Sequence, residues 1–200
     1  MVKNIAKDSP KILGLDVSTK TIGWSLFDIE SKSLLELTHV SPRPKPTTDS
    51  KIEDLILKSG VFKEKLMNYV GMGITKVIIE EPLLNSNNIW TVGILMRYNT
   101  LICNQVYEIL GIVPQFISTY NSRKFAFPYL VQQNDKGKFV LFGGLPKDSD
   151  KKVIIWEQVA KREPQIMWQY TKNNTLKKEN YDQTDAYCAA LGYMKFKEIW

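Results

Sequence analysis

Apolar residues near the amino terminus fall into two short runs, residues 11–17 and 22–29, separated by the polar residues 18–21. Runs of this length on either side of a polar turn predict two strands that form a hairpin. A third strand is expected at about 34–40. Three prolines between positions 42 and 46 then predict a loop, because proline lacks the backbone N–H that a helix or a sheet uses.

The middle of the chain alternates between helical and strand patterns. Residues 51–70 place apolar side chains near helical spacing, and either Asp49 or Ser50 is a suitable cap for this helix. Residues 75–80 form a short apolar run that predicts a buried strand. Residues 89–110 predict a long helix that is apolar on most faces. One sheet face cannot cover such a helix, so we expect part of it to contact a second subunit.

The carboxyl-terminal part continues with a strand predicted over 112–118 and a region, 127–150, that fits no regular core element. An Asn-Asp-Lys-Gly sequence between two apolar runs in this region predicts an inserted, protruding hairpin. Helices are expected at 151–162 and about 182–198, with a polar loop at 166–180. Strands interspersed with helices in this order predict an α/β fold, a sheet of mixed direction flanked by helices.

The length and composition are those of one globular domain covering residues 1–200, of which 44% are hydrophobic. No apolar run reaches the length that would span a membrane, so no membrane partner is expected. Residues 1–8 lack the apolar core of a signal peptide. The protein is therefore predicted to be cytoplasmic, in a host cell if a phage encodes it.

Histidine and cysteine usage narrows the possible chemistry. His39 is the single histidine, which excludes His-rich zinc sites and leaves one candidate base for Ser-His-Asp or Cys-His catalysis. It lies in a predicted strand, and we assign it no role. Cys103 and Cys188 both lie in apolar helical patterns, which favours two buried free thiols over a disulfide.

The net charge of +6 is unevenly placed. Residues 121–178 contain twelve Lys or Arg and only five Asp or Glu. A basic segment in an otherwise balanced chain is typical of a protein that binds a polyanion. A solvated, lysine-rich surface would give the same pattern, and charge alone does not decide between the two.

Four carboxylates stand out against their apolar surroundings. Asp16 interrupts the first apolar run, and Glu80 ends the run at 75–80. Asp182 and Asp185 are three residues apart, so they share one face of the last predicted helix. Carboxylates in apolar surroundings are costly unless a positive charge compensates them, and Mg²⁺ often does so in phosphate chemistry.

Each of these acids also has an ordinary explanation. Asp182 or Asp185 could cap the helix that they open. Lys20 could pair with Asp16. A glutamate at the end of a strand is common on protein surfaces. The four acids become a stronger candidate when they are considered together, because two strand ends beside a helix start could hold two metal ions about 4 Å apart around a phosphodiester.

Short motifs around these acids resemble the RuvC family of Holliday-junction resolvases. The motifs are Gly14-Leu15-Asp16, Thr21-Ile22-Gly23-Trp24, Ile79-Glu80-Glu81 and Asp182-x-x-Asp185-Ala186. The resemblance covers about 11–126 and 147–195. It implies a ribonuclease H-like fold in which Asp16, Glu80, Asp182 and Asp185 bind two Mg²⁺ ions, with Mn²⁺ as a substitute. Glu80 matches the second carboxylate of the family better than Glu81 does.

The same resemblance implies a biological role. It implies a homodimer that nicks opposed strands of a four-way junction or of other branched DNA, leaving 5′ phosphates and 3′ hydroxyls. The expected phosphate contacts are Arg123, Lys124, Lys151 and Lys152. Trp24 is expected in the core, not as a platform for a base. The chain departs from a minimal member of the family at 127–150 and in the long connection at 30–50.

Two other functions remain open at this point. The segment Gly14-Leu15-Asp16-Val17-Ser18-Thr19-Lys20-Thr21 also resembles the first phosphate loop of actin-like ATPases and sugar kinases. Those proteins need two such domains and a Gly-rich adenosine loop, so this chain would be a fragment of one. A non-catalytic DNA-binding protein of the same fold is the other alternative, and the four acids argue against it.

Overall fold

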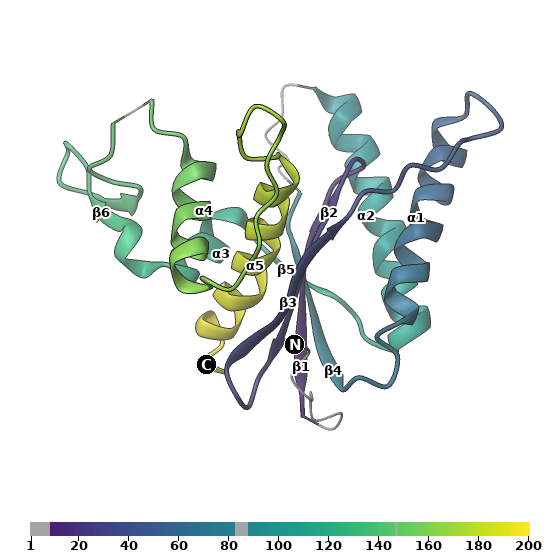
Figure 1. The fold of residues 1–200 in the computed structure, drawn as a ribbon, viewed down its shortest axis with the longest axis horizontal. Coiled ribbons are helices and arrows are strands. Elements are labelled where there is room, and N and C mark those ends of the chain that lie inside the picture. The colour runs from purple at the N-terminus through teal and green to yellow at the C-terminus, as the bar shows by residue number, and fades with distance from the viewer. Residues whose placement is uncertain (1–8, 83–87, 147) are drawn as a thin grey trace.

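A five-stranded mixed sheet forms the centre of the protein (Figure 1), in a computed structural model that describes residues 9–82, 88–146 and 148–200. The strands are β1 (Lys11–Val17), β2 (Ile22–Asp28), β3 (Ser33–Val40), β4 (Ile74–Glu80) and β5 (Gln115–Ile117). Their order is β3-β2-β1-β4-β5. The first three strands are antiparallel neighbours, while β4 runs parallel to β1 and β5 parallel to β4.

Helices cover both faces of this sheet (Figure 1). The pair α1 (Lys51–Met67) and α2 (Ile89–Leu110) lies on one face, and α3 (Thr119–Ala126), α4 (Lys151–Arg162) and α5 (Glu179–Phe196) lie on the other. A 3₁₀ turn, η1 (Pro128–Leu130), leads into a separate hairpin of β6 (Val131–Gln133) and β7 (Phe139–Leu141). The predicted α/β fold, a mixed sheet flanked by helices with a hairpin inserted at about 127–150, is confirmed.

The sheet separates two apolar layers, because successive side chains of a strand point to opposite faces. Ile12, Phe27 and Ile78 belong to the layer under α5. Leu13 and Trp24 belong to the layer under α1 and α2. Both faces of β1 and β2 are therefore buried, which is why these strands have nearly continuous apolar sequences. Trp24 has no exposed surface, so its predicted place in the core is confirmed.

Helix α5 lies unusually close to β1 and β2. A Cβ atom on Gly23 would overlap the carbonyl oxygen of Asp182, and one on Gly14 would overlap that of Ala186. The Ser25 hydroxyl donates a hydrogen bond of 2.8 Å to the same Ala186 oxygen. The glycines thus let the backbone of α5 rest directly on the sheet, which fixes the helix against the ends of the strands.

Gly23→Ala should therefore destabilise the protein by about 1–3 kcal/mol, the usual cost of overpacking a close contact. Gly60→Ala is the matched control, because nothing lies within 4 Å of a Cβ at this position in α1. The control should leave stability unchanged or raise it by up to about 1 kcal/mol, since alanine favours a helix. Urea unfolding of both variants measures the difference. Equal stabilities would show that α5 can move away from the sheet at no cost.

Several predicted boundaries were wrong. The first helix ends at Met67, not at residue 70, and Ser50 caps it by accepting a hydrogen bond from the Glu53 N–H. The strand predicted over 112–118 pairs with β4 only at 115–117. Residues 119–126, for which the sequence predicted no element, form α3. Ser118 caps that helix, and it packs extensively against α5.

The start of α5 was also misplaced. The helix begins at Glu179, three residues before the predicted position. The Asn180 side chain holds this end, because its amide donates to the Gln169 carbonyl at 2.7 Å and accepts from the Gln169 N–H at 3.2 Å. These bonds join positions eleven residues apart, so the start of α5 cannot be predicted from local sequence patterns.

Other predictions agree with the structure. Cys103 and Cys188 are free thiols as predicted, although only Cys188 is fully buried and Cys103 is half-buried. The hairpin turn lies at Asn134–Gly137, where the Asn134 side chain accepts hydrogen bonds from two backbone N–H groups of the turn. In the described ranges, no helix is both long enough and apolar enough to cross a membrane. The prediction about a signal peptide concerns residues 1–8, which lie outside the described residues.

Candidate active site

The ends of β1 and β4 bring two of the four predicted carboxylates together. Leu15 of β1 lies opposite Ile79 of β4 in a parallel pair, so the following residues, Asp16 and Glu80, lie at the same edge of the sheet. Helix α5 brings the other two acids to this edge, because its first turns rest on Gly23.

Electrostatics show how closely the four acids approach one another. Burial raises the pKa of Asp16 well above its usual range, and the negative charges of Glu80, Asp185 and Asp182 raise it further. Each of the three other acids therefore acts electrostatically on Asp16. We call Asp16, Glu80, Asp182 and Asp185 the carboxylate cluster.

Glu80 and Asp182 are perturbed in the same direction. Burial and then the charge of Asp185 raise the pKa of Glu80 to about 7, although Arg123 and Thr119 partly oppose this. Burial raises the pKa of Asp182 to about 6, and Lys152 opposes part of that shift. These carboxyl groups would lose their protons only with difficulty unless further positive charge entered the cluster.

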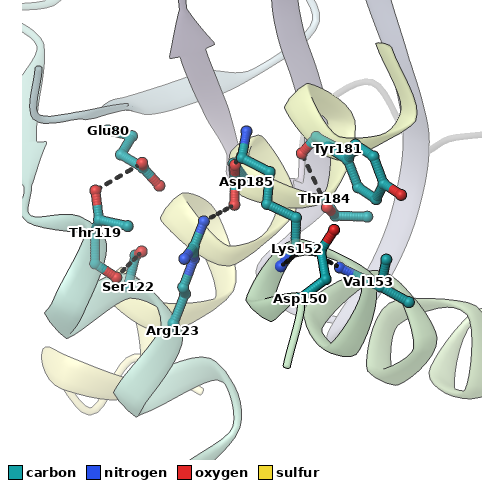
Figure 2. A network of polar contacts seen from close by, with 10 residues as sticks. All are labelled: Glu80, Thr119, Ser122, Arg123, Asp150, Lys152, Val153, Tyr181, Thr184 and Asp185. Carbon is teal, nitrogen blue, oxygen red and sulfur yellow. Dashed lines mark hydrogen bonds and ion pairs between the residues drawn. The ribbon is translucent and has the colours of Figure 1, made fainter. Parts of the chain in front are cut away.

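Two basic side chains reach Asp185, the most deeply placed aspartate of α5 (Figure 2). The Arg123 guanidinium donates from Nη2 to Asp185 Oδ1 at 2.7 Å, and Lys152 Nζ lies 3.7 Å from Oδ2. The Arg123 side chain is only 11% exposed. The Arg123 guanidinium is therefore a buried partner of the carboxylate cluster, and its predicted contact with a DNA phosphate stays a prediction.

The other predicted basic residues lie outside the cluster. Lys124 Nζ is 5.7 Å from the centre of the Tyr120 ring and 5.5 Å from that of Phe125. Lys151 Nζ is 6.0 Å from the centre of the Phe142 ring. Both lysines thus lie over aromatic side chains on the surface, where they could still meet a phosphate.

The structure also decides between the ordinary explanations of the acids. The N-cap position of α5 is Lys178, and no side chain caps this helix, so neither aspartate is a cap. Within the described residues, Lys20 forms no ion pair with Asp16. Glu81 is exposed, while its backbone N–H donates to the Ile117 carbonyl at 2.8 Å.

Two supporting residues were not anticipated from the sequence. Thr119 donates from its hydroxyl to Glu80 Oε1 at 2.8 Å (Figure 2), and only the fold places it there. Asp150 caps α4 by accepting hydrogen bonds from the N–H groups of Lys152 and Val153. An aspartate directly before an apolar helical pattern is a recognisable cap signal, so Asp150 could have been found.

The four carboxylates of the cluster are the type of ligand that a hard cation prefers, but their side chains are not arranged around a common point. Within the described ranges, no three His, Cys, Asp or Glu side chains are arranged to hold a metal ion as they stand. However, Glu80 Oε2 is buried and has no hydrogen-bond partner among these residues. An all-oxygen donor set with an unpartnered carboxylate oxygen and raised pKa values fits Mg²⁺, which prefers such ligands.

Comparisons with known proteins give matches among solved structures alone. No protein-family model matches the chain, and no curated protein sequence matches it. RuvC of Thermus thermophilus superposes with a TM-score of 0.57 at 14% identity, over 94% of this chain and 95% of that one. The same protein in complex with a Holliday-junction substrate gives a TM-score of 0.60 at 11% identity, with the same coverage.

A third structure has a similar sheet and helices. The yeast mitochondrial Holliday-junction resolvase Ydc2 superposes with a TM-score of 0.59 at 10% identity, over 99% of this chain and 83% of that one. The superpositions establish a shared fold, but sequence identities this low do not establish a shared activity. The activity must be argued from the site. The chain therefore has a RuvC-like fold, a ribonuclease H-like mixed sheet flanked by helices.

Proposed function

We propose that this protein is a metal-dependent endonuclease that resolves four-way DNA junctions or other branched DNA. The observation that supports the proposal is that Glu80 of β4 and Asp182 and Asp185 of α5 all act electrostatically on the buried Asp16 of β1. Such a group is costly to fold without a cation, and phosphodiester cleavage is the chemistry that most often uses one there. The similarity in fold to a RuvC bound to a Holliday junction supports branched DNA as the substrate.

The proposed roles follow from the positions of the side chains. Asp16, Glu80, Asp182 and Asp185 would hold two Mg²⁺ ions, with Mn²⁺ as a substitute. Bound ions would supply Lewis-acid activation of water and would stabilise charge on the departing 3′ oxygen. Thr119 would hold the Glu80 carboxylate in place through its hydrogen bond. Arg123 and Lys152 would balance the charge of Asp185 and then contact the scissile phosphate.

A DNA-binding protein without catalysis is the second candidate function. It would need the basic surface but not the carboxylate cluster, whose mutual repulsion lowers the stability of the fold. A fragment of an actin-like ATPase would lack the second domain that such enzymes use to enclose a nucleotide. The carboxylate cluster therefore favours the nuclease over both alternatives.

Labelled four-way junction, fork and linear duplex, each incubated with and without Mg²⁺, test the nuclease directly. We expect paired nicks in the junction that depend on Mg²⁺, with 5′ phosphate and 3′ hydroxyl ends, and little cutting of the duplex. Binding to the junction without cleavage under every metal condition would favour the non-catalytic DNA-binding protein instead.

A homodimer is part of the proposal, because two nicks in opposed strands require two active sites. Helix α2 leaves several large apolar side chains more than 45% exposed: Ile89, Trp90, Met96 and Tyr107. We expect light scattering at micromolar concentration to give twice the mass of the 23.0 kDa chain. A monomer both with and without DNA would contradict the dimer.

The inserted hairpin offers a further prediction, about how the DNA shape is recognised. Phe142 packs against the core, whereas Phe139 is 69% exposed in β7. If Phe139 stacks on an unpaired base at the junction, Phe139→Ala should lower junction affinity by about 1–3 kcal/mol and spare duplex affinity. Tyr170→Ala, another exposed aromatic, is the control. Equal binding by both variants would assign the hairpin no part in recognition.

A further inference from the structure

A cleft of about 760 Å³ lies directly beside the carboxylate cluster. The turn between β1 and β2 lines one part of it, and the proline loop after β3 lines another. Helix α1 and the start of α5 complete the walls, so the cleft is built from both helical layers and from the edge of the sheet. Asp182 and Lys152 are among the lining residues, which makes the cleft continuous with the candidate active site.

Cations outnumber acids on the walls of this cleft. The cationic residues are Lys20, Arg43, Lys58, Lys152 and Lys178, and the acids are Asp54, Glu179 and Asp182. Lys58 is bound to Asp54 at 2.7 Å, and Lys152 lies against the carboxylate of Asp185. The other three cations are exposed and form no ion pair in the part of the chain that the structure describes. Three unpaired positive charges around one cleft favour an anionic ligand.

Hydrogen bonds hold the turn that carries Lys20, and prolines restrict the loop that carries Arg43. Ser18 closes the turn before Lys20, since its hydroxyl donates to the Thr21 carbonyl at 2.8 Å and accepts from the Thr21 N–H at 3.1 Å. Arg43 lies between Pro42 and Pro44, whose rings fix their own backbone angles. Binding to a preformed wall costs less conformational entropy than ordering a loose loop.

We infer that this cleft binds the sugar-phosphate backbone of the cleaved DNA strand next to the scissile phosphate, with Lys20, Arg43 and Lys178 as phosphate contacts. The inference rests on the proposed nuclease function and adds a binding site to it. The cleft is much larger than one phosphate group, and it opens onto the carboxylate cluster. In a duplex, each strand carries one phosphate for about every 3.4 Å of helix axis, so separate cations can meet successive phosphates.

Two of these three phosphate contacts, Lys20 and Arg43, lie outside the basic segment at 121–178. Lys20 belongs to the turn between β1 and β2, and Arg43 belongs to the long connection at 30–50. Lys20 has only uncharged residues within three positions on either side, and Arg43 has only Lys45 as a charged neighbour in the proline loop. Contacts to phosphates carry no base information, so the cleft should fix the position of the strand and leave its sequence unread.

A triple variant tests the cleft, namely Lys20→Gln, Arg43→Gln and Lys178→Gln in one chain. The matched control removes three exposed lysines elsewhere: Lys32→Gln, Lys63→Gln and Lys161→Gln. Both triples are made with Asp16→Asn, so that the DNA is bound but not cut. Thermal unfolding checks that both are folded, as expected for exposed substitutions.

Binding to a four-way junction is then measured over a range of salt concentrations. The cleft triple should bind at least about tenfold more weakly near 0.1 M salt. Its slope of log affinity against log salt should fall by about 0.9 for each lost contact, or roughly 2–3 in all. The control triple should keep the slope of its parent, and equal slopes for the two triples would overturn the inference.

Phosphate substitution locates the contact on the DNA. Uncharged methylphosphonates within a few nucleotides of the cut should weaken binding by the parent protein and have little further effect on the cleft triple, because the two changes remove the same contact. Equal losses for both proteins would place the lysines and arginine elsewhere on the DNA and overturn the inference. Cleavage by the unsubstituted protein is scored separately. Its absence would refute the nuclease, while the salt dependence of the two triples would still test whether the cleft binds DNA.

Discussion

Asp16→Asn should lower the rate of junction cleavage by a factor on the order of 10³ or more while junction binding remains intact. Asp16 interacts with each of the other three acids, so its loss removes the central ligand of the proposed metal centre. The amide has almost the shape of the carboxyl group but cannot supply the negative charge. Single-turnover cleavage and binding, measured on the same junction, separate the two effects.

The same substitution should stabilise the metal-free protein, because it removes a buried negative charge from among three others. Asp135→Asn is the control, since this exposed aspartate in the hairpin turn makes the same change of charge far from the cluster. The control should cleave and unfold like the unsubstituted protein. Cleavage by Asp16→Asn at the unsubstituted rate would refute the catalytic role of the cluster.

Without metal, the carboxylate cluster should make the protein less stable as the pH rises towards 7. The pKa of Glu80 is raised to about 7 in the folded state from an ordinary value near 4.5, so the folded protein holds this proton more tightly than the unfolded chain does. The stability that this proton contributes is therefore fully present below about pH 4.5 and is lost as the pH rises towards 7. Asp182 acts in the same direction as the pH rises towards 6.

Other titrating groups change the stability in the opposite direction. The contribution of Glu80 is therefore measured as the difference in stability between Glu80→Gln and the unsubstituted protein. Asp28 has a lowered pKa, since Ser9 and Ser31 donate hydrogen bonds to its carboxylate, and its contribution is lost as the pH falls. Glu80→Gln should gain about 1–3 kcal/mol over the unsubstituted protein between pH 5 and 7.5 without metal. Urea unfolding in EDTA at several pH values measures this gain.

Mg²⁺ should reverse the loss of stability at neutral pH. A ligand that binds only the folded state at a hundred times its dissociation constant adds about 2.7 kcal/mol. We expect a gain of that order in the unsubstituted protein at pH 7.5 and a much smaller one in Asp16→Asn. No response to Mg²⁺ or Mn²⁺ in either protein would contradict a metal centre at this edge of the sheet.

Local sequence patterns were sufficient for much of the fold. The predicted limits of α2 and α4 agree with the structure, in which Gly111 ends the first helix in a left-handed conformation and Asp150 caps the second. The strands β1 and β2 were recognisable because both of their faces are buried, which makes their sequences mostly apolar. Asp16 was conspicuous for the same reason, as a charge inside such a strand.

Long-range contacts decided what these patterns could not. Asn180 sets the start of α5 through hydrogen bonds to Gln169, and Arg123 reaches Asp185 across 62 positions of sequence. The sequence identified Arg123 as basic, but only the packing of α3 against α5 buries its guanidinium beside a carboxylate.

The sequence by itself determined most of the elements, their apolar faces and the four candidate acids, because each of these depends on neighbours within a few residues. The tertiary structure alone decided which charges meet. Lys20, Arg43 and Lys178 come from three distant segments, and the fold places them around one cleft beside Asp182. Contacts of this kind leave no periodic trace in the sequence, since the side chains that form them satisfy no local pattern.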